Sequence, residues 1–450
     1  MKPQTTLEPK ALKPVFAALS RRNAAYAARF PGDFAGRQPV HTVYGGAHLF
    51  KSDSAQKLGE LAIRALARCA PDAVTFARAV GLDESLAHAV YDRVVDKLKR
   101  EPVEDFRIDF EDGYGHRPGA EEDGHAVAAA LEVAQGLDEG TLPPFLGIRI
   151  KALSGESSAR SVRTMDVFLT TLVRQTKGRL PDRFCVTLPK IVHPGQAAAL
   201  AKLLNAFEKK KKLKPNSVKV ELMVETPQSI IDADGTAPLR AMVDALGARA
   251  VGAHFGTYDY TASCGITAAH QHMARASCDF AKAVMQVTLA GTGVTLSDGA
   301  TNVLPVGPHR AAPGERLSEE QDRENVEAVR RAWRLHYDYA TRSLVNGFYQ
   351  GWDLHPAQLP TRYAAVYAFF LSGLPQATAR LKNFVEKSAQ AALVGDVFDD
   401  AATGQGLLNY FLRARSCGAI TAAEAAATGL TPEEFASRSF LKILEGRRKG

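Results

Sequence analysis

Two successive apolar runs of this sequence each lead into a carboxylate. The stretch 220–230, VELMVETPQSI, runs into Glu225, and the stretch 252–260, GAHFGTYDY, leads into Asp259. Mg²⁺ prefers such ligands: one or two carboxylates, with water and substrate oxygens completing six positions. The pair therefore predicts a magnesium site. Buried acids satisfied by backbone amides are the alternative interpretation.

Other ionisable residues stand where further strands are expected to end. Arg149 could hold a substrate carboxylate or a developing enolate through its planar guanidinium, or it could simply pair with Asp109 or Glu111. A metal ion and an arginine together would stabilise the negative oxygen that forms when a bond next to a carbonyl breaks. These strand-end residues are Asp109, Glu111 and Asp112, Arg149, Lys190, Asp298 and His355.

Several residues are candidates for proton transfer or covalent chemistry, each with a simpler structural reading. Lys190 could form a Schiff base, but pairing with a neighbouring acid is the simpler reading. Cys264 is expected to be a small buried residue rather than a nucleophile. A single histidine is more often structural than catalytic. The candidate bases are His48, His116, His125, His254 and His355.

Strand and helix patterns alternate along the chain and would place these residues at one edge. Eight strand–helix units predict a (β/α)8 TIM barrel, whose active site lies at the carboxyl ends of the strands. A doubly wound sheet is the alternative, but no GxGxxG or GxxxxGK[ST] loop follows the first strand. The predicted strands are 41–50, 105–112, 144–151, 183–191, 217–225, 249–256, 293–298 and 351–355.

The barrel is expected to span 41–375, between two extensions. Residues 1–40 form an N-terminal arm, helical around 12–28, and 376–450 form a C-terminal helical extension or lid. Within the barrel, Ser318 precedes acidic residues and opens a capped helix over 318–347.

Composition limits the class of protein. The chain has 450 residues, 46% of them hydrophobic, and a net charge of +7. The basic residues are spread along the chain, so we expect small anionic substrates rather than nucleic acid. The five cysteines are odd in number and form no CxxC pair, as is typical of a reducing compartment. No segment approaches the length of a membrane span, so we expect a cytoplasmic protein without a membrane partner.

The ordered series of motifs resembles the citrate lyase β-subunit-like / HpcH–HpaI aldolase family of the phosphoenolpyruvate/pyruvate barrel superfamily, which is related to malyl-CoA lyase. The resemblance covers roughly 41–375, and its motifs are IDFEDG (108–113), IRI (148–150), LPK (188–190), VET (224–226), GTYD (256–259), CGI (264–266) and GWDLHPAQ (351–358). That family shows a similar DLEDAV, VRIN, PK, ET, GxxDLxxDLG and IHPxQ series. YDYTASCGI departs from the acid-rich family motif, and the segments 111–126 and 297–310 are longer than usual.

The resemblance implies roles for individual residues. Mg²⁺ would be held by Glu225 and Asp259, with Glu111 and Asp112 around its water ligands and Arg149 as the clamp for a 2-oxo acid or enolate. Gly256, Thr257 and Lys190 would contact the substrate together with Arg149. Relatives supply an acid/base aspartate from beyond the barrel. Here the candidates are Asp396, Asp399 and Asp400, with a helix-capping turn as the alternative.

The predicted activity is that of a magnesium-dependent carbon–carbon lyase or aldolase. It would cleave or form a bond next to a 2-oxo acid through a metal-stabilised enolate. The substrate is expected to be a 2-oxo acid or its hydroxy adduct, with a coenzyme A thioester as a further option, and the protein is expected to be a homo-oligomer. The alternatives are a thioester hydrolase, a phosphoenolpyruvate-linked phosphotransferase on the same barrel, and a non-catalytic metabolite-binding protein.

Overall fold

The computed structural model describes residues 6–34, 36–386, 392–394, 397–399 and 401–449. Its main sheet has eight parallel strands in the order β7-β6-β5-β4-β3-β2-β1-β8. Each strand falls within its predicted range, and the (β/α)8 barrel is confirmed. The strands are β1 (His41–Gly46), β2 (Asp105–Asp109), β3 (Phe145–Arg149), β4 (Cys185–Leu188), β5 (Lys219–Val224), β6 (Ala250–Phe255), β7 (Thr295–Ser297) and β8 (Gly351–Asp353).

The barrel closes between β7 and β8 through a short parallel contact. Ser297 forms a parallel bridge with Gln350. The backbone N–H of Asp298 donates to the carbonyl oxygen of Gln350 at 2.9 Å. Only a few residues take part, so the contact between β7 and β8 is the shortest strand pairing in the barrel. Closure therefore depends on packing around it.

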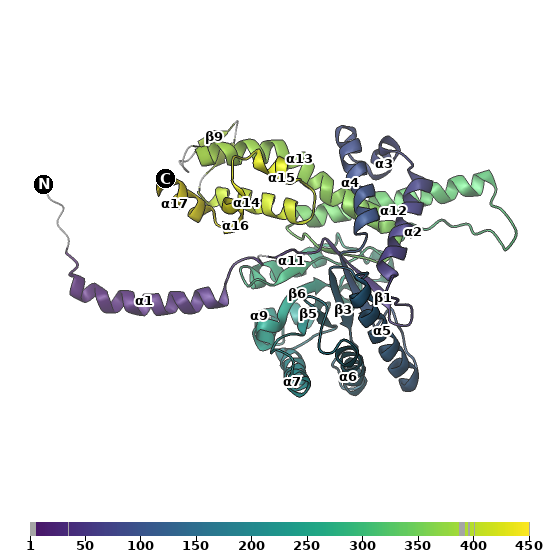
Figure 1. The fold of residues 1–450 in the computed structure, drawn as a ribbon, viewed down its shortest axis with the longest axis horizontal. Helices are drawn as coiled ribbons and strands as arrows, with labels where there is room; N and C mark the ends of the chain where they lie inside the picture. Colours follow the sequence, from purple (N-terminus) through teal and green to yellow (C-terminus); the bar gives the residue numbers. More distant parts are fainter. Residues whose placement is uncertain (1–5, 35, 387–391, 395–396, 400, 450) are drawn as a thin grey trace.

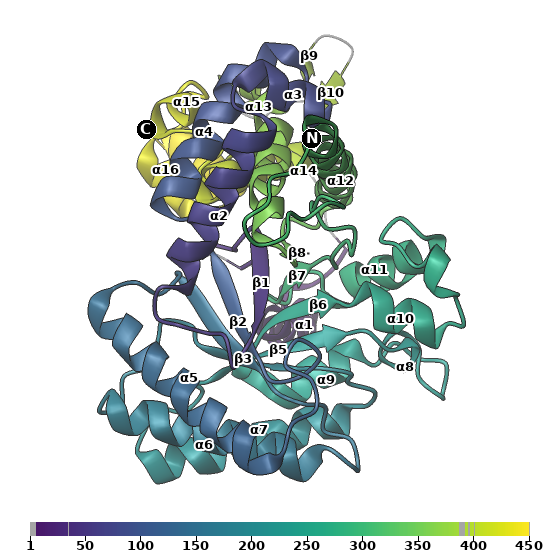
Figure 2. The same ribbon diagram turned by 90° about the vertical axis from the view of Figure 1, so that its right-hand side faces the viewer.

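Helices cover the strands on both sides. Figure 2 shows α5, α6, α7 and α9 around the lower part of the sheet, and α2, α4, α12 and α13 in a second helical layer above it. The helices of the barrel are α2 (Ser54–Cys69), α3 (Ala73–Val80), α4 (Ala87–Arg100), α5 (Gly119–Glu139), α6 (Ser158–Gln175), α7 (Pro194–Lys211), α8 (Pro227–Ile230), α9 (Leu239–Leu246), α10 (Thr257–Ser263), α11 (Ala276–Leu289), α12 (Glu319–Val345) and α13 (Leu359–Glu386). Short 3₁₀ helices are also present: η1 (Glu84–Leu86), η2 (Gly247–Arg249), η3 (Ala268–His270) and η4 (Pro356–Gln358).

The two ends of the chain lie outside the strand–helix alternation. The N-terminal helix α1 (Pro9–Arg29) leaves the barrel and points away from it (Figure 1). The C-terminal helices gather against α13 (Figure 1). They are α14 (Ala401–Ser416), α15 (Ala422–Ala426), α16 (Pro432–Ser437) and α17 (Phe440–Lys449).

Helix α12 begins directly after Ser318, the capping residue that the sequence predicts. The side chain of Ser318 accepts from the N–H of Gln321, and the Gln321 side chain accepts in return from the N–H of Ser318. This capping box satisfies two backbone donors that a helix end otherwise leaves unpaired. The acids of the first turn also suit the positive end of the helix dipole.

The C-terminal part differs from the sequence-based expectation in one respect. Only helices and turns were expected beyond residue 375, but β9 (Ala392–Val394) pairs antiparallel with β10 (Val397–Asp399). The valines, leucine and phenylalanine of these two segments favour strands. Asp396 and Asp400 lie outside the described residues, so the acid/base role suggested for these aspartates stays a prediction. Helix α13 runs through residue 375, so the predicted division at that point falls inside a continuous helix.

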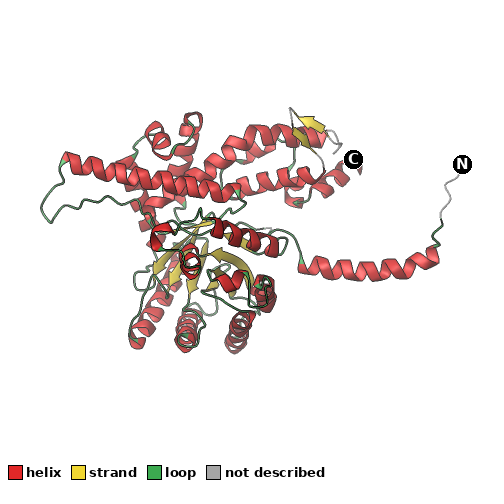
Figure 3. Cartoon of the chain, turned by 180° about the vertical axis from the view of Figure 1, so that it is seen from behind, coloured by secondary structure: helices red, strands yellow, loops and turns green. Residues whose placement is uncertain are grey.

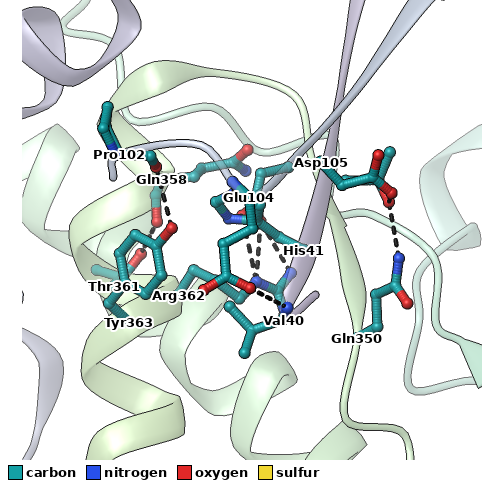
Figure 4. Close-up of polar contacts among 12 residues, drawn as sticks. Val40, His41, Pro102, Glu104, Asp105, Gln350, Gln358, Thr361, Arg362 and Tyr363 are labelled. Atoms are coloured by element: carbon teal, nitrogen blue, oxygen red, sulfur yellow. Dashed lines mark hydrogen bonds and ion pairs between the residues drawn. The ribbon is translucent and has the colours of Figure 1, made fainter. Parts of the chain in front are cut away.

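A buried polar seam joins the start of the barrel to α13 (Figure 4). The Glu104 carboxylate accepts from the N–H of Val40 at 2.8 Å, and the Glu104 N–H donates to Nε2 of His41 at 3.0 Å. On the α13 side, the hydroxyl of Tyr363 donates to the carbonyl oxygen of Pro102 at 3.0 Å. The seam therefore pins α13 against β1 and β2.

Asp353, at the end of β8, is the charged centre of the same region. Its carboxylate is fully buried and accepts from Arg362 at 2.8 Å and from Nε2 of His336 at 2.9 Å. His41 lies 3.0 Å away on the other side. Burial opposes ionisation of this acid, but Arg362 and His336 hold its pKa well below the usual range. One carboxylate thus links β8, β1, α12 and α13.

No helix in the described part of the chain is both long enough and apolar enough to cross a membrane.

We expect Asp353→Asn to destabilise the fold strongly, because it leaves the buried Arg362 without its counter-charge. Removing one partner of a buried ion pair costs about 3–5 kcal/mol of unfolding free energy. Urea unfolding followed by circular dichroism measures this change. The matched control is Asp338→Asn, which removes an exposed pair with Arg334 on α12 and should have a much smaller effect. Equal effects of the two substitutions would contradict the role given to Asp353.

Candidate active site

Asp109, the last residue of β2, organises the carboxyl end of the barrel. Its two oxygens accept from Arg149 Nε at 2.7 Å and from Arg149 Nη2 at 2.5 Å. They also accept from the backbone N–H groups of Glu111 at 2.9 Å and Gly113 at 2.8 Å. A Cβ at position 113 would lie 2.6 Å from the Asp109 carboxylate, so glycine is required there. Asp109 thereby fixes both the arginine and the acidic loop that follows β2.

The guanidinium of Arg149 is buried and held on three sides. Its centre lies 4.8 Å from the ring of Tyr44 and 5.5 Å from the ring of Trp352, and the side chain is 2% exposed. Burial alone would lower the pKa of this group, but Asp109 and Glu111 raise it, so it stays charged. Nη1 is buried without a hydrogen-bond partner among the described residues and lies 3.4 Å from Glu111. Nη1 therefore meets Glu111 and Asp112 only at ion-pair distances, without a hydrogen bond.

Lys190 bridges the acids of the site. Its ammonium donates to Glu111, lies 3.0 Å from Asp112 and 3.8 Å from Asp259, and its pKa is raised because these acids outweigh the effect of burial. Its backbone N–H donates to the Glu225 carboxylate at 2.8 Å. Lys190 is a non-glycine residue with φ of 50°, a strained conformation that tends to mark functional sites. The ion pairs favour the simpler interpretation of Lys190 over a Schiff base.

Glu225 and Asp259 stand just after β5 and β6 and are close enough for the charge of Asp259 to act on Glu225. Glu225 is 1% exposed, and burial together with the charge of Asp259 raises its pKa to about 8. Asp259 lies in the first turn of α10 and its side chain is 43% exposed. A Cβ at Gly256 would lie 2.5 Å from Glu225, so glycine at the end of β6 lets this carboxylate take its place.

Glu111 and Asp112, in the loop after β2, are the two neighbouring acids that the Lys190 ammonium contacts most closely. Burial raises the pKa of Glu111 to about 7 despite the opposing charge of Arg149, and the neighbouring Asp112 adds to the rise. Burial also acts on Asp112, but hydrogen bonding with Glu111 and the charges of Arg149 and Lys190 lower its pKa. The pKa values of these two neighbouring carboxyls are therefore shifted in opposite directions.

The side chains described above gather at the carboxyl end of the barrel, called the mouth here. Acidic side chains outnumber basic ones at this mouth. The cations that pair with its acids among the described residues are Arg149 and Lys190. The acids are Asp109, Glu111, Asp112, Glu225 and Asp259. Burial is the largest cause of the raised pKa values of Glu111 and Glu225, and the neighbouring carboxylates of Asp112 and Asp259 add to the rise.

The donor set fits magnesium rather than a metal that needs a closed protein cage. Within the described ranges, no three His, Cys, Asp or Glu side chains gather as a metal cluster. Glu225 and Asp259 would supply two carboxylates, which is the number that Mg²⁺ commonly takes, so the predicted ligand pair stays a prediction. The predicted place of Glu111 and Asp112 around its water ligands likewise stays a prediction. A divalent ion would also balance the excess negative charge.

The predicted substrate contacts Gly256 and Thr257 lie beside these acids. Thr257 begins α10 and is 2% exposed, and its hydroxyl is buried without a hydrogen-bond partner in the part of the chain that the structure describes. The N–H of Gly256 donates to the carbonyl oxygen of Val224 at 3.0 Å, so it is already used. Thr257 is therefore the better placed of the two to meet a ligand.

Two strand-end residues do not reach the mouth. The Asp298 carboxylate binds Lys282 of α11 at 3.0 Å and Ser343 of α12 at 2.6 Å, so it faces the helices rather than the mouth. Nδ1 of His355 accepts from the N–H of Ala357 at 3.2 Å and caps η4. This agrees with the structural interpretation of His355.

The other candidate histidines occupy different surroundings. His254 lies inside the barrel, 3.4 Å from the hydroxyl of Tyr44, and His116 is exposed. His48 lies beside His125, with ring centroids 6.0 Å apart, next to the loop after β2. Burial and the neighbouring Arg117 lower the pKa of His48. None of these contacts joins a histidine to Glu225 or Asp259.

Sequence reasoning missed the stacking of Tyr44 and Trp352 on Arg149. The signal was present, because β1 and β8 are neighbouring strands and each carries one large aromatic residue next to the mouth. Trp352 Nε1 is also buried without a hydrogen-bond partner among the described residues.

A cavity of about 760 Å³ lies at the opposite end of the barrel. Its lining includes Gln38, Val40 and Thr295, at the starts of β1 and β7, together with Arg413 of α14. It shares no residue with the acidic mouth. The position of this cavity is therefore no guide to the position of the acidic mouth.

We expect Glu225→Gln to gain stability relative to the wild type as pH rises, with a metal chelator present. The pKa of Glu225 is raised to about 8, so the folded protein retains a proton that the unfolded chain releases near the ordinary glutamate pKa of 4.5. Wild-type stability therefore falls between about pH 5 and pH 8, whereas glutamine carries no such proton. Urea unfolding across this range measures the difference between the two proteins. A difference that stays constant with pH would contradict the assignment, and Glu139→Gln on the exposed end of α5 is the control.

Comparison with known proteins places this barrel among its relatives. No curated protein matches the chain. A citrate lyase from Burkholderia xenovorans has a TM-score of 0.54 at 19% identity, with 87% of this chain and 96% of that chain covered. CitE from Mycobacterium tuberculosis, solved with magnesium, acetoacetate and coenzyme A, has a TM-score of 0.46 at 15% identity, covering 85% and 98%. A Haloferax volcanii malate synthase has a TM-score of 0.47 at 11% identity, covering 86% and 100%.

The likeness to the citrate lyase shows a shared fold. The family described as "Domain of unknown function (DUF6986)" matches residues 19–443, which is most of the chain. This protein, a (β/α)8 barrel, therefore belongs to the DUF6986 family.

Proposed function

We propose that this protein is a magnesium-dependent carbon–carbon lyase or aldolase that acts on a 2-oxo acid or its β-hydroxy adduct. The observation that carries the proposal is the neighbouring pair Glu225 and Asp259 in a mouth rich in carboxylates, beside Nη1 of Arg149, which makes no hydrogen bond among the described residues. The shared fold with a citrate lyase is consistent with it. When bound, Mg²⁺ would supply a Lewis acid for the carbonyl oxygen.

Arg149 would bind the anionic end of the substrate. Its Nη1 is the donor proposed for this contact, because Nε and Nη2 bond to Asp109, whereas Nη1 makes no hydrogen bond among the described residues. In retro-aldol cleavage the bond next to the carbonyl breaks and its electron pair moves into an enolate. A fixed guanidinium in a site with little water stabilises that charge without having to reorient.

Glu111 is the group best suited to move the proton. Its pKa of about 7 lets it accept and return a proton near neutral pH, where general acid–base catalysis is most effective. It lies 3.4 Å from Arg149 Nη1, so it faces the same space as the proposed enolate. In the condensation direction it would take a proton from the carbon next to the carbonyl and pass a proton to the alkoxide oxygen formed on the acceptor. In cleavage it would take the proton of the hydroxyl group, whose carbon becomes a carbonyl, and deliver a proton to the enolate carbon.

The first test is metal and substrate binding by isothermal titration with MgCl₂ and pyruvate. We expect Glu225→Gln/Asp259→Asn to lose binding by more than the 10–100-fold typical of outer-shell substitutions, because both metal ligands are removed. The control is Asp138→Asn/Glu139→Gln, an exposed acid pair at the end of α5. Undiminished binding in the mouth variant would end the magnesium proposal.

The second test follows exchange of the methyl protons of pyruvate in D₂O by NMR. Enolate formation replaces these protons with deuterium even when no acceptor is present. We expect Glu111→Gln to slow exchange by about 10²–10⁴-fold while magnesium still binds. Glu156→Gln, in an exposed loop, is the control. Exchange at the wild-type rate in Glu111→Gln would remove this residue from the proton transfer, and absence of exchange in the wild type would count against the enolate itself.

A further inference from the structure

Helix α1 is held rigidly at its root but has no buried residue along its length. At the root, Arg29 pairs with Asp244 at 2.7 Å, the Phe30 ring lies 4.5 Å from the guanidinium of Arg240, and the N–H of Gly32 donates to Gly291 at 2.9 Å. Beyond the root the helix extends away from the body of the protein (Figures 1 and 3). Most helical stability in proteins comes from packing of an apolar face, so an unpacked helix of 21 residues is unexpected.

One side of α1 is apolar and exposed. At about 100° per residue, its large apolar side chains fall within roughly a third of the helix circumference. Val15, Phe16, Leu19 and Tyr26 are 60%, 57%, 49% and 64% exposed. This α1 stripe consists of Leu12, Val15, Phe16, Leu19 and Tyr26. The basic residues of the helix, Lys10, Lys13, Arg21, Arg22 and Arg29, lie outside the stripe.

A second bare apolar face lies on α11. Phe280 is 55% exposed and Val287 is 83% exposed, although a helix on the outside of a barrel normally presents polar residues to water. The spacing of four, three, four and three residues aligns this face along one side of the helix. The α11 outer face consists of Ala276, Phe280, Ala283, Val287 and Ala290, all exposed.

These two faces cannot meet within one chain. The root of α1 lies against Gly291, directly after α11, and from there α1 runs away from the barrel (Figure 1). In a pair of copies related by a two-fold axis, each α1 can reach the α11 of the other copy. The lengths agree, because 21 helical residues span about 31 Å and the 14 residues of α11 span about 21 Å.

The charges favour α11 over a second α1 as the partner of the stripe. Five basic residues and one acid, Glu8, stand on or just before α1, so two arms laid together would bring like charges close. The α11 outer face carries no charge. The cation on α11, Lys282, is buried against Asp298 instead.

We propose that the protein self-associates by reciprocal exchange of its arms: the α1 stripe of each copy packs on the α11 outer face of the other. The interface joins two different surfaces of the same chain, and a two-fold axis closes it. It is independent of the chemistry proposed for the barrel mouth, because no mouth residue takes part.

Sedimentation velocity of the full-length protein tests the association. We expect the wild type to sediment as a dimer or a larger even-numbered oligomer. Phe16→Asp/Leu19→Asp and Val287→Asp should each weaken association at least tenfold, while Ala17→Asp, on the other side of α1, should not. Circular dichroism melting confirms that each variant is folded. A monomeric wild type, or a Val287→Asp variant that associates as well as the wild type, would overturn the proposal.

Cross-linking between two single-cysteine variants tests the pairing itself, in a Cys264→Ser background that removes the exposed native thiol. We expect Leu19→Cys mixed with Val287→Cys to form a disulfide-linked dimer, and Leu19→Cys alone to form none. Cross-linking of Leu19→Cys with itself would show arm-on-arm pairing and overturn the proposal. So would a monomer that binds phosphatidylserine vesicles through α1, because the stripe would then serve a membrane.

Discussion

Excess negative charge at the carboxyl end of the barrel is the constraint around which the site is arranged. Carboxylates from the segments after β2, β5 and β6 converge there, and the cations paired with them in the described chain are Arg149 and Lys190. Burial, together with the neighbouring carboxylates, raises the pKa of Glu225 to about 8 and that of Glu111 to about 7. A site that keeps such groups close together, instead of replacing one by a neutral residue, is poised to receive positive charge.

The backbone keeps those acids from moving apart. Asp109 accepts from two backbone N–H groups of the following loop as well as from Arg149, and Glu225 accepts from the N–H of Lys190. Lys190 takes a strained φ to make that bond, which costs on the order of 1–3 kcal/mol. Strain of this kind persists only where the surrounding barrel fixes the geometry. The strands below the mouth, buried along most of their length, supply that rigidity.

The strands and the position of the mouth could be predicted from sequence, because parallel strands read as short apolar runs and always end at the same edge. The direction in which each side chain points could not be predicted in this way. Asp298 follows β7 just as Glu225 follows β5, yet it points outward to Lys282, which α11 buries among apolar residues.

Arg149 shows a related limit. Its pairing with Asp109 and its function were weighed as alternatives, but three donor nitrogens allow both. Two of them bond to the acid, and the third makes no hydrogen bond among the described residues. The hairpin β9–β10 was missed because a three-residue strand carries too little periodicity to be told from a turn.

Helix α11 departs from the usual pattern of a barrel helix at one residue of its inner side and on its outer side. On its inner side Lys282 is 4% exposed, which is costly for a charged group unless it is paired, and Asp298 pairs with it. On its outer side Phe280 and Val287 are 55% and 83% exposed, so much of their apolar surface adds no stability to a single chain. The inner side is thus explained by a partner within the barrel. By the same reasoning the outer side calls for a partner beyond it, and the bare stripe of α1 has the matching chemistry.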